Sequence, residues 1–196
     1  MVDFAFARHG RAGKFWAAVL AGAALILGCT GATAQNVNES ASSIFVAANN
    51  AVKQGDYNTA YRQYLRLATN GYPEAQFNLG LMYQRGVGVN LDPAEAGYWY
   101  EKAAANGIAE AMLNLGTLYD VGGGLGPDLN MAAQWYAKAA AAGNAQAMCN
   151  LGLLYTRNNN LQQAKYWYDQ ATQAGYSPPA SFVQALQQLQ TQLSSN

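Results

Sequence analysis

Apolar residues recur at helical spacing along most of this 196-residue chain. Leu79 and Tyr83 lie four residues apart, and the same Leu-Tyr pair recurs twice further along the sequence. Residues four apart share one face of an α-helix. The segment Asp92-Pro93-Ala94-Glu95 places an N-cap residue, a first-turn proline and a capping-box glutamate in order, so it predicts a helix start. The pattern therefore predicts helices joined by short loops.

This helical pattern repeats with a period of 36 residues. The motif Ala-x-x-Asn-Leu-Gly occurs at 75–80, 111–116 and 147–152, and a Trp-Tyr pair follows each copy. A fixed period of about 20 to 50 residues is the signature of a stacked repeat protein. The last unit is four residues shorter, and the missing residues fall between its two helices, where deletions are tolerated. We predict an all-α fold, an α/α superhelix of stacked helix pairs.

The period and the composition of the chain ends together predict the domain organisation. A solenoid must cover the exposed apolar face of its last repeat, which is the role we expect for the final helix. The predicted segments are a signal peptide at 1–34, a flexible lead-in rich in Asn and Ser at 35–43, a divergent repeat at 44–72, full repeats at 73–108 and 109–144, a shortened repeat at 145–176, and a capping helix at 177–196.

The first 34 residues have the pattern of an export signal. Three basic residues precede an apolar run at 15–27, which is short for a helix that crosses a bilayer. A small-x-small site for signal peptidase ends at Ala34. Cys29 ends a segment similar to a bacterial lipobox, which would instead give a lipid-tethered envelope protein. We favour cleavage after Ala34 and a periplasmic location over the lipoprotein and over a retained membrane anchor.

Loss of this segment changes the chemical inventory of the chain. It removes three basic residues and one acidic residue, which leaves eight basic and ten acidic residues and a net charge of −2. A chain without a basic surface is poorly suited to nucleic acid. The only histidine, His9, is lost together with Cys29, so Cys149 is the single thiol. We expect no His- or Cys-based nucleophile, no metal site and no cofactor.

The repeated motif resembles the Sel1-like repeat, a relative of the tetratricopeptide repeat. The resemblance rests on Ala-x-x-Asn-Leu-Gly-x-x-Tyr, on Gly86-Val87-Gly88-Val89 in the loop, and on Ala-x-x-Trp-Tyr-x-Lys-Ala-Ala. Residues 44–71 are more similar to the tetratricopeptide type. The resemblance implies a scaffold or regulator that binds a protein or peptide of the cell envelope in a concave groove. A cell-wall or β-lactam hydrolase is the alternative, for which only carboxylate pairs remain available.

The tetratricopeptide relationship implies that the first helix of each pair lines that groove. Positions that differ between repeats would then determine specificity, because the framework around them is constant. The predicted groove residues are Phe77, Leu81, Arg85, Leu113, Thr117, Asp120, Leu153 and Arg157. An asparagine ladder either binds a peptide backbone or bonds to the neighbouring helix, and we favour the second role. Its members are Asn78, Asn114 and Asn150.

Two further repeated features predict internal packing. A glycine in the middle of each first helix lowers helix propensity, so we expect a close approach of the neighbouring helix there. These glycines are Gly80, Gly116 and Gly152. The tryptophans of the second helices are expected to act as core wedges, since large aromatic side chains supply most of the apolar area. They are Trp99, Trp135 and Trp167.

Overall fold

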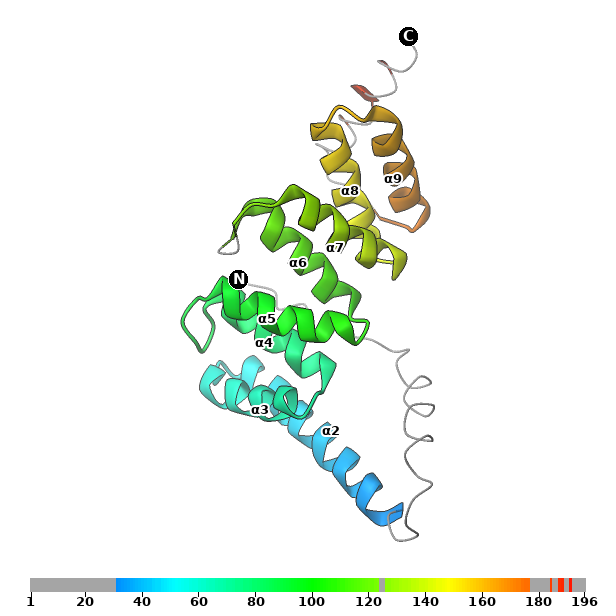
Figure 1. Ribbon diagram of the computed structural model, residues 1–196. Helices are drawn as coiled ribbons and strands as arrows, with labels where there is room; N and C mark the ends of the chain where they lie inside the picture. Colours follow the sequence, from blue (N-terminus) through cyan, green and yellow to red (C-terminus); the bar gives the residue numbers. More distant parts are fainter. Residues whose placement is uncertain (1–30, 124–125, 177–183, 185–186, 189–190, 192–196) are drawn as a thin grey trace. The chain divides into compact units, whose positions relative to one another are not determined.

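The computed structural model describes residues 31–123, 126–176, 184, 187, 188 and 191 (Figure 1). The chain divides into two compact units, 1–43 and 44–196, and the repeats lie in the second. The described residues form α-helices that are joined by turns and loops, which confirms the predicted all-α class. Their bounds are α2 Gly31–Lys53, α3 Tyr57–Thr69, α4 Pro73–Arg85, α5 Pro93–Ala105, α6 Ala109–Val121, α7 Leu129–Ala141, α8 Ala145–Arg157 and α9 Leu161–Gln173.

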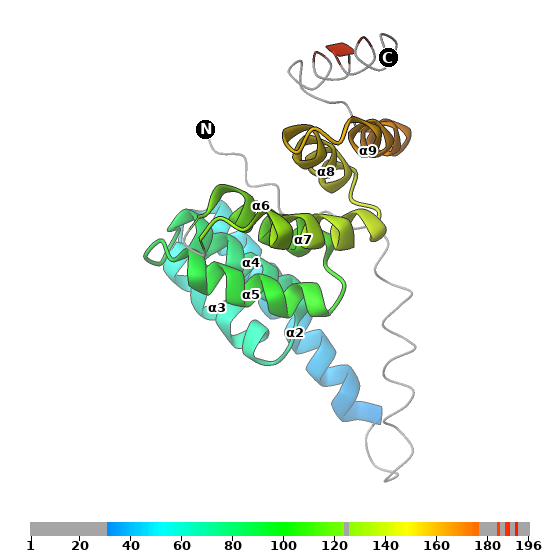
Figure 2. The same ribbon diagram turned by 45° about the horizontal axis from the view of Figure 1, so that its top comes forward.

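The helices of the second unit pack in the order of the chain. Helix α4 pairs with α5, α6 with α7, and α8 with α9, and each pair packs on the next through α5 with α6 and α7 with α8. Figures 1 and 2 show these three pairs following one another. We call α4, α6 and α8 the A helices, and α5, α7 and α9 the B helices. Short loops between antiparallel neighbours make this arrangement a helical-repeat solenoid.

The helix starts follow from local hydrogen bonds. Asp92 caps α5 by accepting from the N–H groups of Ala94 and Glu95, at 3.0 and 3.1 Å. The predicted capping box is only half correct. The Asp92 side chain caps the helix as expected, but the Asp92 N–H donates to the Tyr83 carbonyl at 3.0 Å and not to Glu95. That bond ties the end of the loop back to α4. Asp128 makes the same two kinds of contact at the start of α7.

The N-terminal end of the described residues differs from the prediction. Residues 35–43, predicted as a flexible lead-in, belong to α2. The chain contains no glycine or proline between Gly31 and Gly55, where φ is +76°, so nothing interrupts the helix before that glycine. Most of the predicted signal peptide and capping helix lies outside the described residues. Among the described residues no helix is both long and apolar enough to span a membrane.

A ladder of tyrosines forms the centre of the core. Tyr64, Tyr100, Tyr136 and Tyr168 are almost completely buried. A Cβ atom placed on Gly80, Gly116 or Gly152 would lie only 2.2 to 2.4 Å from the tyrosine ring of the same repeat, so the predicted close approach is confirmed. The tyrosine of each Trp-Tyr pair is the residue that meets the glycine. Of the three tryptophans predicted to pack in the core, Trp99 is buried, whereas Trp135 and Trp167 are only partly buried.

Candidate interaction surface

The buried tyrosines present their hydroxyls to polar side chains of the A helices. Tyr100 donates to Gln84 Oε1 at 2.6 Å, and the Tyr168 and Thr156 hydroxyls lie 3.0 Å apart. Tyr136 donates to Thr117 Oγ1 at 3.3 Å and to Asp120 Oδ2 at 3.4 Å. Burial is the main cause that raises the pKa of Tyr136 to about 12. The predicted groove residues Thr117 and Asp120 therefore both accept from the one buried hydroxyl of Tyr136.

The asparagine ladder connects successive repeats. A hydrogen bond from Asn114 of α6 opposes the burial-induced rise in the pKa of Tyr100, and Asn150 of α8 acts in the same way on Tyr136. Each contact runs from an A helix to the B helix of the preceding repeat. Asn78 is 5% exposed, and its Oδ1 atom has no hydrogen-bond partner within the described part of the chain. These contacts support the packing role, and peptide binding by the ladder stays a prediction.

The apolar residues predicted to form the groove floor are largely inside the core. Phe77 and Leu81 are each 7% exposed and pack with residues of α5 and α6. Leu113 is 8% exposed and packs with residues of α7 and α8. These three side chains hold neighbouring helices together and do not form an open floor. Leu153 of α8 is 37% exposed.

The charged positions predicted for the groove are not independent of one another. Arg157 Nη1 of α8 lies 2.5 Å from Asp120 Oδ1 of α6, so an ion pair connects two successive A helices. The Arg157 side chain is 54% exposed and that of Asp120 14%. Arg85 is exposed at the end of α4 and contributes a positive charge near the Tyr100 hydroxyl.

Removal of this ion pair is expected to change stability only slightly. Arg157→Ala should lower the free energy of unfolding by about 0.5–1 kcal/mol, because one partner is mostly solvated. The loss should shrink as salt concentration rises, since salt screens exposed charges. Urea denaturation at low and high salt measures both effects, and Arg66→Ala, at an exposed basic position in the last turn of α3, is the matched control. A salt-independent loss would show that packing of the arginine stem matters more than its charge.

A pocket that the sequence analysis missed lies beside the start of α5. Its lining residues come from α3, from the end of α4, from the following loop and from the first turn of α5, and its volume is about 800 Å³. They are Tyr61, Tyr83, Gly88, Val89, Asn90, Asp92 and Glu95. We call it the tyrosine pocket. The sequence contains one indication of this pocket, because two of its residues are not repeated one period later. The residues 36 positions after Tyr61 and Glu95 are Gly97 and Met131.

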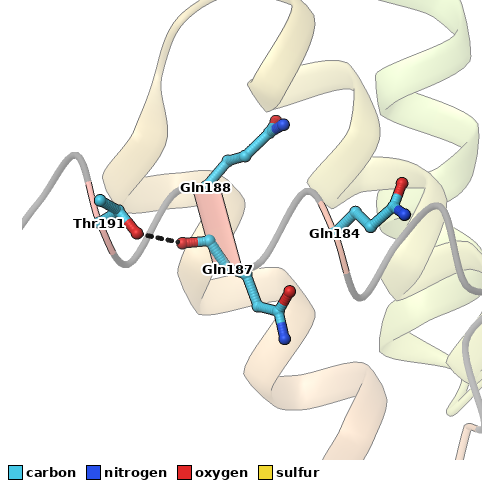
Figure 3. Close-up of a pocket in the computed structure, with 4 residues that line it drawn as sticks. All are labelled: Gln184, Gln187, Gln188 and Thr191. Carbon is cyan, nitrogen blue, oxygen red and sulfur yellow. Dashed lines mark hydrogen bonds between the residues drawn. The ribbon is translucent and has the colours of Figure 1, made fainter.

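A second, smaller pocket of about 400 Å³ lies near the C-terminal end of the chain. Figure 3 shows Gln184, Gln187, Gln188 and Thr191 around it. All four side chains are uncharged, and the Thr191 hydroxyl donates to the Gln187 carbonyl at 2.9 Å. The Gln187 side chain points away from those of Gln184 and Gln188 (Figure 3). The four lining side chains include no carboxylate, imidazole, amine or thiol.

The described residues offer little else for catalysis or metal binding. Nowhere in the described ranges do three or more His, Cys, Asp or Glu side chains gather in a way that could hold a metal ion. Cys149 is 3% exposed, and burial raises the pKa of its thiol to about 11. A thiol with such a pKa is almost entirely protonated at neutral pH and is therefore a poor nucleophile.

The paired helices and the 36-residue period define a helical-repeat protein of the solenoid class. Residues 73–108, 109–144 and 145–176 each match the Sel1 repeat model. These matches cover more than half of the chain, which therefore belongs to the Sel1 repeat family. Sel1 repeats are protein–protein interaction modules, and proteins built from them are generally non-catalytic scaffolds.

Solved structures include similar chains. A Sel1 repeat protein from Oxalobacter formigenes is 33% identical with a TM-score of 0.63, and the match covers 69% of this chain and 59% of that chain. The protective antigen c5321, present in uropathogenic Escherichia coli strains, displays an SLR fold. It is 32% identical with a TM-score of 0.67, over 70% of this chain and 31% of that chain. MamA, at 19% identity and a TM-score of 0.54, is similar in fold alone.

One curated protein is similar over a short segment. The chitin synthase regulator SKT5 of Saccharomyces cerevisiae is 46% identical over 48 residues. That segment is 24% of this chain and 7% of the yeast protein. The likeness therefore leaves most of the larger protein without a counterpart here.

Proposed function

We propose that this chain is exported across the inner membrane and binds a periplasmic or envelope protein through the exposed surface of its A helices, as a scaffold or regulator. The main support for the proposal is that a buried contact is constant between the repeats, whereas exposed side chains of the A helices differ. The Gly-Tyr contact is the same in all three Sel1 repeats, whereas Arg85, Leu153 and Arg157 are exposed and occupy positions that vary. The yeast relative named as a regulator of chitin synthase supports a regulatory role for such repeats.

The binding half of the proposal is tested by comparing two variants of the tagged protein in affinity capture from an envelope extract. The A-helix variant combines Arg85→Ala with Leu153→Ala, and the control combines Tyr98→Ala with Gln134→Ala on exposed positions of the B helices. We expect one captured protein to be retained by the wild type and the control and lost by the A-helix variant. Equal capture by both variants, with equal helicity by circular dichroism, would contradict binding through the A helices.

The export half is tested by the intact mass of the protein recovered from cells. A chain that begins at Gln35 supports cleavage after Ala34 and a periplasmic product. A lipid-modified Cys29 at the N-terminus would replace this with a tethered envelope lipoprotein. Recovery of the complete chain from the cytoplasmic fraction would contradict export. Binding and export can therefore fail separately.

A further inference from the structure

The tyrosine pocket combines aromatic walls with negative charge. The Tyr61 and Tyr83 hydroxyls lie 2.9 Å apart, and their rings meet edge to face with centroids 6.1 Å apart. Asp92 and Glu95 form the acidic side, and no lining residue is basic. The pKa of Tyr83 is raised by burial first, then by its contact with Tyr61 and by the charges of Glu95 and Asp92. The charges of the two carboxylates therefore act on Tyr83.

The Glu95 carboxylate is available to a ligand, because the N–H group that it was predicted to accept from is already bonded elsewhere. A capping-box glutamate would accept the N–H of Asp92, but that N–H donates to the Tyr83 carbonyl. No hydrogen bond or ion pair of the exposed Glu95 carboxylate occurs within the described part of the chain. The dipole of α5 adds only about half a positive charge at this end, less than the two negative charges beside it.

The loop that forms one wall is held in place by close packing. Gly88 has φ of +73°, and a Cβ atom there would lie 2.8 Å from Tyr57 Cβ and Tyr57 O and 3.0 Å from Met82 Cε. Only glycine allows the loop to approach α3 and α4 so closely. The bond from the Asp92 N–H to α4 fixes the other end of the loop. The wall is therefore positioned before any ligand arrives, which lowers the entropic cost of binding.

The pocket belongs to one repeat. At the positions equivalent to Tyr61 and Glu95, the next repeat has Gly97 and Met131, so it lacks one aromatic wall and one carboxylate. The third repeat is four residues shorter in the same loop. The Gly-Tyr contact of the core, in contrast, recurs in all three Sel1 repeats. The aromatic and acidic lining of the pocket is therefore a property of one repeat and not of the repeated framework.

We infer that the tyrosine pocket binds a lysine or arginine side chain of the protein partner. Tyrosine rings attract cations through their π faces, and a carboxylate forms charge-assisted hydrogen bonds with ammonium and guanidinium groups. A neutral or acidic side chain would gain neither interaction. The inference rests on the proposed role as a protein-binding module and adds the chemistry of one anchoring residue of the partner.

The test uses two blocked pentapeptides that differ only at the central residue, arginine in one and its neutral isostere citrulline in the other. Binding is followed by backbone amide chemical shifts of the isotope-labelled full chain. We expect the arginine peptide to shift resonances of residues 88–95, with binding that weakens as salt increases. The citrulline peptide should bind about tenfold more weakly, the effect of losing a charged hydrogen bond.

The matched variant is Asp92→Asn with Glu95→Gln. Asparagine is as good an N-cap as aspartate, so the variant removes both charges while α5 keeps its cap. Glu101→Gln, at an exposed position of the same helix, is the control. We expect the variant to lose the preference for arginine and the control to keep it. Equal binding of the two peptides to the wild type, or shifts centred on another repeat, would overturn the inference and leave the A-helix capture experiment unaffected.

Discussion

Truncation of Tyr100 to alanine is expected to lower the free energy of unfolding by about 3–5 kcal/mol, the usual cost of removing a buried aromatic side chain. Tyr100 has no exposed surface, and its ring packs against Phe77 with centroids 5.8 Å apart. Its hydroxyl donates to Gln84, which would lose its partner in the interior. A single domain of this size is stable by only about 5–15 kcal/mol, so the change would remove a large share of that stability.

Urea denaturation followed by far-UV circular dichroism measures this loss. Tyr98→Ala is the matched control, because Tyr98 lies two residues earlier in α5 and is 49% exposed. We expect the control to cost less than about 1 kcal/mol, as surface substitutions usually do. Tyr100→Phe should fall between the two, at about 1–3 kcal/mol, because it leaves the Gln84 oxygen without its donor. Equal losses for Tyr98→Ala and Tyr100→Ala would contradict the central position of the tyrosine ladder.

Replacement of Gly116 by alanine is expected to destabilise the protein by about 1–3 kcal/mol, although alanine is the better helix former by about 1 kcal/mol. The added Cβ would lie 2.4 Å from the ring of Tyr136, well inside the usual contact distance of about 3.5–4 Å between carbon atoms. Tyr136 is 1% exposed, so its ring has little room to move away. A gain in stability would show that the ring can be displaced at low cost.

A double-mutant cycle separates this clash from other effects of the substitution. Tyr136→Leu removes the ring that the new methyl group would meet, so the losses from Gly116→Ala and Tyr136→Leu should add to more than the loss measured for the double variant. We expect a coupling of about 1 kcal/mol or more, as is found for residues in direct contact. The pair of Gly116→Ala with the distant Tyr64→Leu should be additive. Additivity in both pairs would mean that the glycine is required for another reason.

Several features of this fold follow directly from the amino-acid order. The 36-residue period places Gly80, Gly116 and Gly152 at equivalent positions, and a mid-helix glycine that recurs indicates a close helix contact. The cap at Asp92 is local as well, because it involves only the next three residues. Features of this kind depend on residues close in sequence or related by a simple period, so sequence alone predicts them.

Other features depend on which side of a helix meets its neighbour. Phe77 and Leu113 vary between repeats and were predicted to line a groove, but the adjacent helices enclose them. Similarly, the sequence does not distinguish the tryptophan from the tyrosine of each Trp-Tyr pair as the residue in the core. The orientation of the B helix places the tyrosine against the glycine. A rotation of one residue along a helix is about 100°, and only packing determines it.

The sequence by itself determined the repeat, its all-α class and the positions of its glycines and caps, because those depend on periodicity and local hydrogen bonds. The tertiary structure decided that Asp120 pairs with Arg157 and that Tyr61 meets Tyr83. It also placed the exposed Glu95 beside that pair of tyrosines. The Asp92 N–H, the expected partner of Glu95, bonds to the Tyr83 carbonyl. These contacts join residues from different helices, and their distances depend on how the helices pack.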